Sequence, residues 1–565
     1  MNPLLSPESG RKHLLLGNLG IVRGAIEAGV AVVTCYPGTP SSEVPDTFFE
    51  LAAETDIYME YSTNEKVALE VGAGAAASGL RTLVTMKHVG VNVAADPLMT
   101  LAYVGVVGGM VVLSADDPMM FSSQNEQDNR YYAKLSKLPL LEPSTPAEAK
   151  EMARYAFDLS EELHLPVILR TTTRINHSRG IVTFGPVRER VTKGVFVKDP
   201  FKKVPVPAVS RVLHKELQAK YEKALTLAND SEYNLGSGRG GWGLITSGVS
   251  YAYVMDALAD LGLQDKTAVL RLGFTHPFPA EAVLNFLRGK EKVLVIEELE
   301  PYLEIETKAA AQEAGIMVPI VGKSLFPRIY EFDPAMVRDR IAKYFGLDYQ
   351  GRKTIRTDDL PAVPGRPPNL CAGCPHRATY YSVKKIAGDE TIYPTDIGCY
   401  TLGILPPLSA ADFLLDMGSS ISTACGISKA TGRKAVAFIG DSTFFHSGIT
   451  GLIDAIYNKH NVLLVIMDNG TTAMTGQQIH PGVDAAPLGR DRQQIKIEDL
   501  VRGLGVEDLH LVKPRNLKKT QEAVKEAMKY QGVSVLISQE YCPLYARRIK
   551  ALPQRPVYMV DQEKC

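Results

Sequence analysis

The segment GDSTFFHSGITGLIDAIYNKHNVLLVIMDNGTTAMTG (residues 440–476) decides the fold of the last third of this chain. One apolar run comes directly before Gly440, another comes shortly before Asn469, and a stretch with helical spacing of apolar residues connects them. Strands joined in this way lie parallel in one sheet, and their carboxyl ends share an edge. The pattern therefore predicts that Asp441 and Asn469 meet at one edge of a parallel sheet.

The polar residues at this edge are those that a magnesium diphosphate needs. Mg²⁺ prefers oxygen ligands, and the Asp441 carboxylate, the Asn469 amide oxygen and the backbone carbonyl of Thr471 would supply the protein's share. Gly440 would let the backbone approach a diphosphate closely, and turn amides such as that of Ser442 would donate to it. The pattern predicts a diphosphate and magnesium site; two ordinary strand-to-helix turns are the alternative.

The same segment resembles the thiamine diphosphate motif, in which Gly-Asp is followed by a distant Asn. Here 25 residues separate Ser442 from Asp468, which stand where the motif usually has Gly and Asn. The cofactor also needs a carboxylate that bonds its aminopyrimidine ring, so that the ring can deprotonate the reactive carbon. Glu65, at the start of an expected helix rich in small residues, is our candidate. Glu70 is the rival, and helix stabilisation is the alternative role for Glu65.

Short apolar runs alternate with helical patterns along the whole chain, which predicts α/β domains with parallel sheets. We expect a first domain at residues 1–240, irregular from about 186, a second at 241–350 and a third at 371–565. A Pro-, Gly- and charge-rich linker is expected at 351–370. The GxGxxG match at 236–241 lies in a polar stretch before a strand, so we interpret it as a linking loop rather than a dinucleotide fingerprint.

The composition excludes several classes of function. The chain of 565 residues has a formal net charge of −1, which gives no electrostatic footprint for nucleic acid or for an anionic membrane. It contains no apolar stretch of transmembrane length and no signal-peptide layout, so we expect a cytoplasmic protein. Seven cysteines in such a protein argue against a disulfide scaffold.

The stretch CAGCPH (371–376) raises the question of what its two cysteines bind. Cys371 and Cys374 could belong to a zinc site, a redox dithiol or an iron–sulfur site. Zinc would call for a second such pair, which is absent, and Pro-His follows Cys374 where a redox helix would begin. Cys35 and Cys425 lie in apolar runs and are expected to be buried.

Several segments together resemble the alpha subunits of indolepyruvate:ferredoxin oxidoreductases, within the 2-oxoacid:ferredoxin oxidoreductases. The likeness extends over essentially the whole chain. The segments are YPGTPSSE (36–43), NEKVALE (64–70), MKHVGVNVAADPL (86–98), ADDPMMFSSQNEQDNR (115–130), CAGCPHR (371–377), TDIGCY (395–400), and GDSTFFHSG with DNGTTAMTGQQ (440–448 and 468–478).

The resemblance implies several doubly wound parallel-sheet domains of the thiamine diphosphate-enzyme type: pyrimidine-binding, transketolase C-terminal-like and diphosphate-binding. It implies oxidative decarboxylation of an aryl 2-oxoacid such as indolepyruvate to an acyl-CoA, with single electrons passed to ferredoxin. The implied cofactors are thiamine diphosphate, Mg²⁺ and a 4Fe–4S cluster. The implied partners are a smaller beta subunit in an α₂β₂ assembly, ferredoxin, coenzyme A and the 2-oxoacid, with no nucleic acid and no membrane.

The resemblance also assigns roles to residues. It implies that Glu65 activates the cofactor, that Thr39 lies by the substrate carboxylate, and that Lys87 and His88 line the active site. His88 and His446 are candidates for proton transfer, although a lone histidine is more often structural. A cubane cluster requires four thiolates, which here would come from Cys371, Cys374, Cys399 and Cys542.

Members of this family usually continue into a ferredoxin-like domain, and we expect that domain to be lacking here, because the sequence stops at Cys565 without its cysteine repeats. Two rival functions stay open. A non-oxidative thiamine diphosphate-dependent 2-oxoacid decarboxylase would share Glu65, Asp441 and Asn469 but would not use a cluster. A non-catalytic electron-relay subunit would need none of these three residues.

Overall fold

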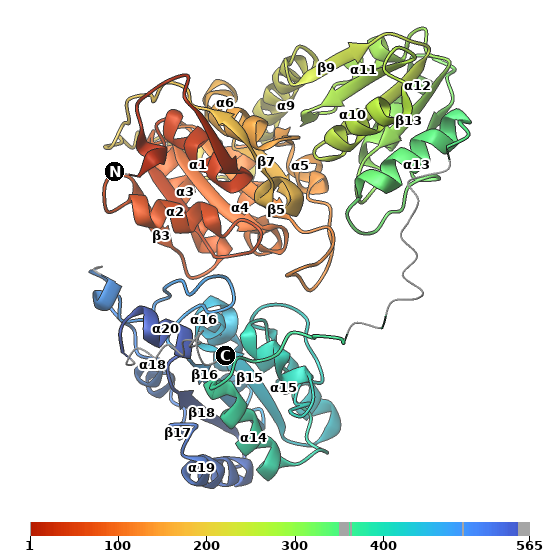
Figure 1. Cartoon of the computed structure of the whole chain (residues 1–565). Coiled ribbons are helices and arrows are strands. Elements are labelled where there is room, and N and C mark those ends of the chain that lie inside the picture. The colour runs from red at the N-terminus through yellow and green to blue at the C-terminus, as the bar shows by residue number, and fades with distance from the viewer. Residues whose placement is uncertain (1, 350–360, 362–363, 489–490, 552–565) are drawn as a thin grey trace, which may run out of the picture. The chain divides into compact units, whose positions relative to one another are not determined.

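The structure is a computed structural model that describes residues 2–349, 361, 364–488 and 491–551. The chain folds into two compact units, Met1–Asp359 and Leu360–Cys565 (Figure 1). Each unit contains mostly parallel strands with helices between them, which confirms the predicted fold class. Residues 351–360 and 362–363 of the expected linker and residues 552–565 at the end of the chain lie outside the described residues.

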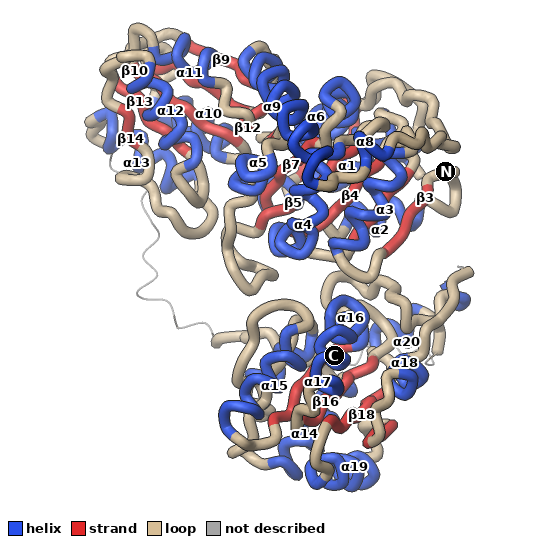
Figure 2. Tube along the Cα trace, turned by 180° about the vertical axis from the view of Figure 1, so that it is seen from behind, coloured by secondary structure: helices blue, strands red, loops and turns tan. Residues whose placement is uncertain are grey.

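The first unit begins with a seven-stranded sheet of order β12-β6-β7-β5-β4-β2-β3. All neighbouring strands are parallel except β12 and β6. Helices cover both faces of the sheet (Figure 2). The strands are β2 (Val32–Cys35), β3 (Tyr58–Tyr61), β4 (Thr82–Lys87), β5 (Met110–Asp116), β6 (Leu140–Leu141), β7 (Val167–Thr172) and β12 (Phe274–His276).

The helices of this region are α1 (Gly17–Glu27), α2 (Glu43–Leu51), α3 (Glu65–Ala77), α4 (His88–Val104), α5 (Arg130–Ser136), α6 (Pro146–Leu163) and α7 (Thr173–His177). A separate antiparallel pair consists of β1 (Lys12–Leu16) and β8 (Arg179–Thr183).

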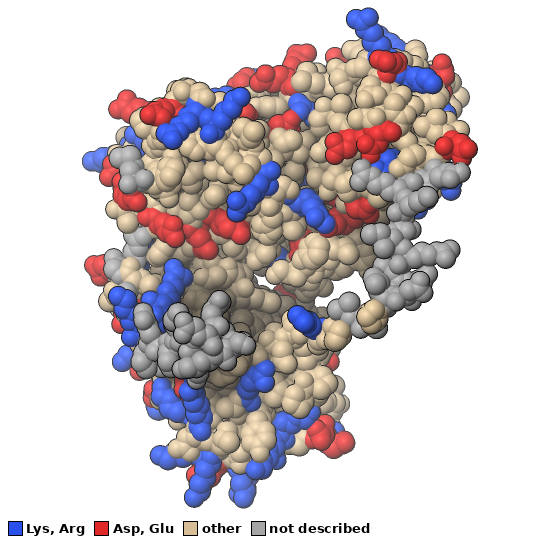
Figure 3. Space-filling model, in the orientation of Figure 1, with Lys and Arg blue, Asp and Glu red and all other residues tan. Residues whose placement is uncertain are grey.

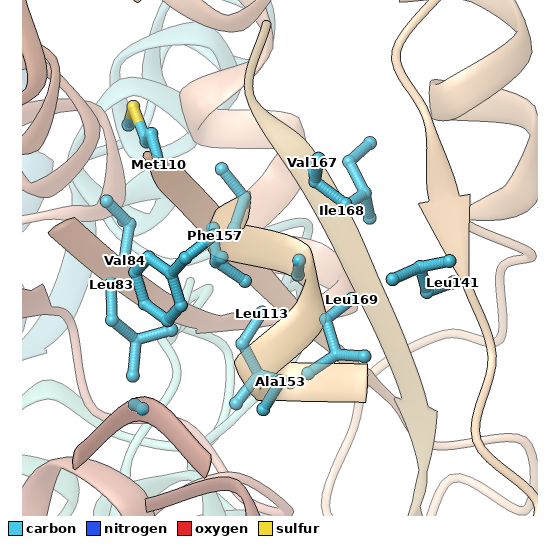
Figure 4. Packing of buried hydrophobic residues seen from close by; sticks show 14 of the residues in the cluster. Leu83, Val84, Met110, Leu113, Leu141, Ala153, Phe157, Val167, Ile168 and Leu169 are labelled. Atoms are coloured by element: carbon cyan, nitrogen blue, oxygen red, sulfur yellow. The ribbon is translucent and has the colours of Figure 1, made fainter. Parts of the chain in front are cut away.

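The core explains why the central strands are continuous apolar runs. Every residue of β5 is buried, as expected for a parallel strand covered on both faces. Figure 4 shows Phe157 and Ala153 of α6 packed with side chains of β4, β5 and β7. The carboxyl ends of these strands are thereby fixed, and the residues that follow them are placed at one edge of the sheet.

A five-stranded sheet of order β14-β13-β10-β11-β9 follows in the same unit. Its strands are β9 (Asn234–Gly238), β10 (Trp242–Ser247), β11 (Thr267–Leu272), β13 (Lys292–Ile296) and β14 (Ile320–Val321). Its helices are α10 (Ser250–Leu261), α11 (Ala280–Leu287), α12 (Tyr302–Glu313) and α13 (Pro334–Phe345).

Two expectations for residues 186–241 are wrong. The second half of this stretch is not irregular, because α9 (Pro207–Asn229) follows the short α8 (Pro200–Lys203) and buries a stripe of small and aliphatic residues. The glycine-rich stretch 236–241 is not only a loop, since its first half pairs antiparallel with β11 as strand β9. No helix follows it, however, so the dinucleotide fingerprint is still ruled out by its context.

The regions of the seven-stranded and five-stranded sheets are joined by hydrogen bonds and ion pairs. Strand β12 follows β11 of the five-stranded sheet along the chain, but it pairs with β6 at the edge of the seven-stranded sheet. Arg130 is almost fully buried, and its guanidinium lies 2.5 Å from Asp128 and 2.6 Å from Glu297, which follows β13. Removing one partner of such a buried ion pair would leave an uncompensated charge and would strongly destabilise the region.

The second unit contains a parallel sheet of order β15-β16-β18-β17. Its strands are β15 (Ala435–Gly440), β16 (Val462–Asp468), β17 (Asp508–Val512) and β18 (Val533–Gln539). Its helices are α14 (Pro375–Ala387), α15 (Ser419–Thr431), α16 (Asp441–Thr443), α17 (Ile449–Tyr457), α18 (Ile497–Gly503), α19 (Leu517–Lys529) and α20 (Pro543–Arg548). One π turn, Phe444–Gly448, joins α16 to α17.

None of the helices in the described part of the chain combines the length and hydrophobicity needed to cross a lipid bilayer.

Candidate functional site

The second unit brings Asp441 and Asn469 together, as the sequence predicts. Strands β15 and β16 are parallel neighbours, so the residues that follow them lie side by side. Asp441 Oδ2 accepts hydrogen bonds from the backbone amides of Asn469 (3.1 Å) and Gly470 (2.8 Å), and Oδ1 accepts one from Ser442 (2.8 Å). Burial by itself would raise the pKa of Asp441, but His480 and these amide donors lower it. The site therefore holds a buried, ionised carboxylate.

The other expected magnesium ligands lie in the loop after β16, whose amides are hydrogen-bonded to this carboxylate. Asn469 Oδ1 accepts a hydrogen bond from the amide of Thr471 (3.1 Å), and both residues are buried. Ser442 Oγ accepts from Thr472 Oγ1 at 2.9 Å, which ties the turn after β15 to the loop after β16. Carboxylate, amide and backbone oxygens are the ligands that Mg²⁺ prefers, so this donor set fits the predicted ion.

Gly440 is required here by an aromatic ring. A Cβ at this position would lie 2.5 Å from a ring carbon of Tyr400, closer than side chains tolerate. Tyr400 follows Cys399 directly, and its hydroxyl donates to the Thr443 hydroxyl (3.0 Å). The close backbone approach expected at Gly440 is therefore an approach to Tyr400, which ties the segment of Cys399 to the turn that carries Asp441.

His480 belongs to the same site, although sequence reasoning did not single it out. Its Nε2 lies 3.1 Å from Asp441 Oδ2, and its Nδ1 accepts a hydrogen bond from the amide of Gly482. Because Nδ1 accepts, Nε2 carries the ring proton and directs it at the Asp441 carboxylate, which lowers the pKa of Asp441. A lone histidine in a loop has no spacing or periodicity by which it could have been found.

Three of the four cysteines expected to hold a cluster lie in segments that are tied to this edge. Cys374 caps α14, and two residues later His376 Nε2 lies 3.1 Å from Asn469 Nδ2. The amide of Cys542, at the start of α20, donates to the carbonyl of Asn469 at 2.9 Å. The third segment is that of Cys399, described above.

The thiols themselves lie close enough to influence one another. Burial raises the pKa of Cys374 to about 11 and that of Cys399 to about 12, and Cys371 and Cys542 contribute to both increases. Cys371 is exposed and the other three are partly buried, whereas Cys35 and Cys425 are buried elsewhere. Within the described residues, no three His, Cys, Asp or Glu side chains are arranged as a ready metal site. The four thiols are of the type and number that a cubane cluster takes, and the cluster itself remains a prediction.

In the first unit, Glu65 and Glu70 have different environments. Glu65 is the first residue of α3 and is buried, and a Cβ on Gly90 of α4 would lie 2.6 Å from its carboxylate oxygen. Glu70 is exposed and pairs with Lys66. Glu65 is therefore the buried carboxylate of the two, packed against a glycine, and Glu70 is already paired at the surface.

Lys87, His88 and the Thr39 loop lie at the carboxyl ends of β2 and β4. A Cβ on Gly38, next to Thr39, would lie 2.9 Å from the Lys87 side chain, so the two segments are in contact. Lys87 Nζ donates to the Ser122 carbonyl at 2.6 Å. Burial lowers the pKa of Lys87 to about 8, although Asp117 and Glu65 act in the opposite direction.

The two histidines considered for proton transfer are both buried. His88 Nε2 lies 3.0 Å from the carbonyl of Asn125 and must carry the proton, and burial lowers its pKa. Its Nδ1 is buried without a hydrogen-bond partner. His446 lies in the π turn beside Ser447, with which its Nδ1 forms a hydrogen bond. His88 is therefore the residue of the two with an unused acceptor atom.

Two stretches of the chain match families of thiamine diphosphate enzymes. Residues 396–538 match the family described as thiamine pyrophosphate enzyme, C-terminal TPP binding domain. Residues 23–218 match the family described as pyruvate flavodoxin/ferredoxin oxidoreductase, thiamine diphosphate-binding. The first match contains Asp441 and Asn469, and the second contains Glu65.

Whole-length relatives are more specific. The indolepyruvate oxidoreductase subunit IorA of Methanothermobacter thermautotrophicus is 50% identical over 576 aligned residues, covering 100% of this chain and 92% of the relative. The subunit of the same name from Thermococcus kodakarensis is 45% identical over 593 aligned residues, covering 100% of this chain and 91% of the relative.

Among solved structures, the 2-oxoglutarate:ferredoxin oxidoreductase from Magnetococcus marinus matches with a TM-score of 0.48 and 16% identity, covering 59% of this chain and 65% of that one. The whole-length relatives are 45% and 50% identical to this chain over its full length. The chain therefore belongs to the IorA family of indolepyruvate oxidoreductase subunits, which are thiamine diphosphate-dependent 2-oxoacid:ferredoxin oxidoreductases.

Proposed function

We propose that this chain is the large catalytic subunit of an enzyme that oxidatively decarboxylates an aryl 2-oxoacid of the indolepyruvate type. The 2-oxoacid, coenzyme A and two oxidised ferredoxins give acyl-CoA, CO₂, a proton and two reduced ferredoxins. Membership of the IorA family supports this reaction and does not favour the non-oxidative alternative. A smaller beta subunit in an α₂β₂ assembly and a cytoplasmic location are further parts of the proposal.

One observation carries the proposal. Asn469 accepts a hydrogen bond from the Cys542 amide through its carbonyl and donates one to His376 through its side chain. A residue expected to bind Mg²⁺ is thereby bonded to the segments of two expected cluster ligands. A decarboxylase that moves no electrons would have no use for this link.

The domains follow from these assignments. In this proposal residues 1–240 form the pyrimidine-binding domain, 241–350 the transketolase C-terminal-like domain and 371–565 the diphosphate-binding domain, with the linker at 351–370. Glu65 would bond the aminopyrimidine ring and shuttle its proton. Asp441, Asn469 and the Thr471 carbonyl would hold Mg²⁺, and the amides after Gly440 would hold the diphosphate. When bound, thiamine diphosphate supplies the carbon nucleophile and holds the electron pair left by decarboxylation.

The chain's own residues would handle the substrate and the electrons. Lys87 carries a positive charge at neutral pH and would pair with the substrate carboxylate, with the Thr39 hydroxyl as a second donor. His88 would accept or return a proton at its free Nδ1. Cys371, Cys374, Cys399 and Cys542 would hold the cluster, which would supply a one-electron acceptor.

The test uses protein purified without oxygen together with its partner subunit. Iron, acid-labile sulfide and thiamine are measured, and electron paramagnetic resonance spectra are recorded before and after indolepyruvate and coenzyme A are added. About four irons per chain, bound thiamine and a substrate-dependent signal are expected. Bound thiamine without iron, combined with release of CO₂, would establish the non-oxidative decarboxylase instead.

A further inference from the structure

We propose that the groove between α14 and α19 is the docking surface for an acidic one-electron carrier protein. We call it the α14–α19 groove. It is lined by Tyr381, Lys385 and Ile386 of α14 and by Leu517, Lys518 and Lys525 of α19, among others. The inference rests on the proposed function, because a carrier is needed only if the cysteines hold a redox centre.

Both helices start at the cysteine loop. Helix α14 begins directly after Cys374, which is its N-cap. Arg515, just before α19, donates from Nη2 to the carbonyl of Gly373, which lies between Cys371 and Cys374 (3.4 Å). The two helices pack against each other. The first residues of both helices therefore lie by the loop that carries the exposed Cys371, where a bound redox centre would come nearest to solvent.

The charge of this surface is predominantly positive, with Glu522 as the acidic residue beside the three lysines of the groove. Helices α14 and α19 carry seven Lys and Arg side chains against two Glu. Figure 3 shows Lys and Arg side chains gathered over the end of the second unit that carries α19. The lysines of α19 are exposed, and none of them forms an ion pair with another described residue. Unpaired positive charge on one face attracts and orients a negatively charged partner.

The middle of the groove is apolar. Tyr381 is 49% exposed and Leu517 is 40% exposed, and they lie among the lysines named above. Exposed apolar side chains within a charged rim are the anatomy of a protein–protein contact. A basic rim around such a centre fits an acidic carrier protein better than a small anion, which would leave the apolar residues exposed.

The experiment compares two electron acceptors on the enzyme assembled with its partner subunit. Acceptor reduction by the 2-oxoacid is followed with an acidic 4Fe–4S ferredoxin and with methyl viologen, which needs no docking surface. The test variant is Lys518→Glu combined with Lys525→Glu. The matched control is Lys429→Glu combined with Lys459→Glu, which makes the same charge change at exposed positions of the same unit.

We expect the test variant to lower kcat/KM for the ferredoxin at least tenfold at low ionic strength, and to flatten its dependence on salt. Viologen reduction should stay within twofold, and the control variant should match the wild type with both acceptors. Unchanged ferredoxin kinetics beside normal viologen reduction would overturn the docking surface alone. Loss of the partner subunit on size exclusion would also overturn it, because the groove would then belong to a subunit interface. If the wild type reduces neither acceptor, the proposed function itself fails.

Discussion

His376 accepts a hydrogen bond from Asn469: its Nε2 lies 3.1 Å from Asn469 Nδ2, and both side chains are buried. Its backbone amide donates to the sulfur of Cys374. One residue therefore touches both an expected magnesium ligand and an expected cluster ligand. Burial lowers the pKa of His376 to about 4, so its ring is neutral at physiological pH and can accept from the amide.

This relationship predicts that His376 positions Asn469 for the metal. His376→Leu removes the acceptor and frees the Asn469 amide to rotate, so Mg²⁺ affinity in the presence of thiamine diphosphate should fall about 10–100-fold. His376→Gln keeps an acceptor oxygen and should stay closer to the wild type. Isothermal titration with Mg²⁺ measures both. Equal affinities for the wild type and the leucine variant would show that Asn469 needs no support.

Glu65 should act in catalysis rather than in folding. Glu65→Gln should lower kcat about 10²–10⁴-fold, the usual size of a proton-transfer contribution, while thiamine diphosphate still binds. Gly90→Ala should also lower kcat, since its Cβ would lie 2.6 Å from the Glu65 carboxylate and displace it. Glu70→Gln is the control, because Glu70 is exposed. Steady-state kinetics at saturating cofactor separate them; a Glu65 variant with normal kcat would refute the assignment.

The four-cysteine set makes a prediction about iron content. Cys399→Ser should lose most of the iron and sulfide of protein purified without oxygen, because a cubane cluster needs four thiolates. Cys425→Ser removes a buried thiol outside the set and should keep the wild-type content. Iron and sulfide analysis, together with the visible absorbance of the cluster, measures this difference. Equal iron in the two variants would exclude Cys399 as a ligand.

Lys87 should make substrate binding depend on pH. Burial lowers the pKa of Lys87 to about 8, so the ammonium is charged below that pH and loses its charge above it. KM for the 2-oxoacid should therefore be flat below about pH 8 and rise up to tenfold per unit above it. Lys87→Met should have a raised KM without this dependence. A wild-type KM that stays constant to pH 9.5 would contradict a carboxylate-binding role.

Glu298 should make stability depend on pH in the opposite way from an ordinary carboxylate. Burial raises the pKa of Glu298 from 4.5 to about 7, while a hydrogen bond from the backbone amide of Phe332 and the charge of Arg170 act against it. Between these values the folded chain keeps a proton that the unfolded chain releases. The stabilisation is complete below pH 4.5 and is lost as the pH rises through 7.

Glu298→Gln is neutral at every pH and should remove this loss. The variant should gain on the order of 1–3 kcal/mol relative to the wild type between pH 5 and pH 8. Thermal unfolding of both proteins across this range is the measurement. A difference in Tm that does not change with pH would mean that Glu298 is ionised in the folded chain.

The sequence predicted the central strands and the edge at which Asp441 and Asn469 meet, because fully apolar runs and their polar ends are local signals. It did not predict α9, whose buried stripe of Val209, Leu213 and Leu217 is masked by the surrounding lysines and prolines. It also missed β9, since glycine-rich residues form a strand there only by pairing with β11. Tertiary pairing outweighed local propensity in that case.

The functional site shows the same division between local and tertiary information. Glu65 could be found because it starts a helix of small residues. His376 and His480 could not be assigned roles, because their partners, Asn469 and Asp441, are reached only through the fold of separate loops. Tyr400 is a similar case, since the reason for glycine at position 440 is a ring from a distant segment.

The pairing of β12 with β6 has a consequence for synthesis on the ribosome. Leu140–Leu141 leaves the exit tunnel well before Phe274–His276 is made, so the β6 edge of the seven-stranded sheet stays unpaired in the meantime. The delay is roughly 130 residues, on the order of ten seconds at about 5–20 residues per second. During that time an open strand edge can recruit other chains. Chaperones that bind nascent polypeptides would protect this edge, and slower translation of the residues before position 274 would lengthen its exposure.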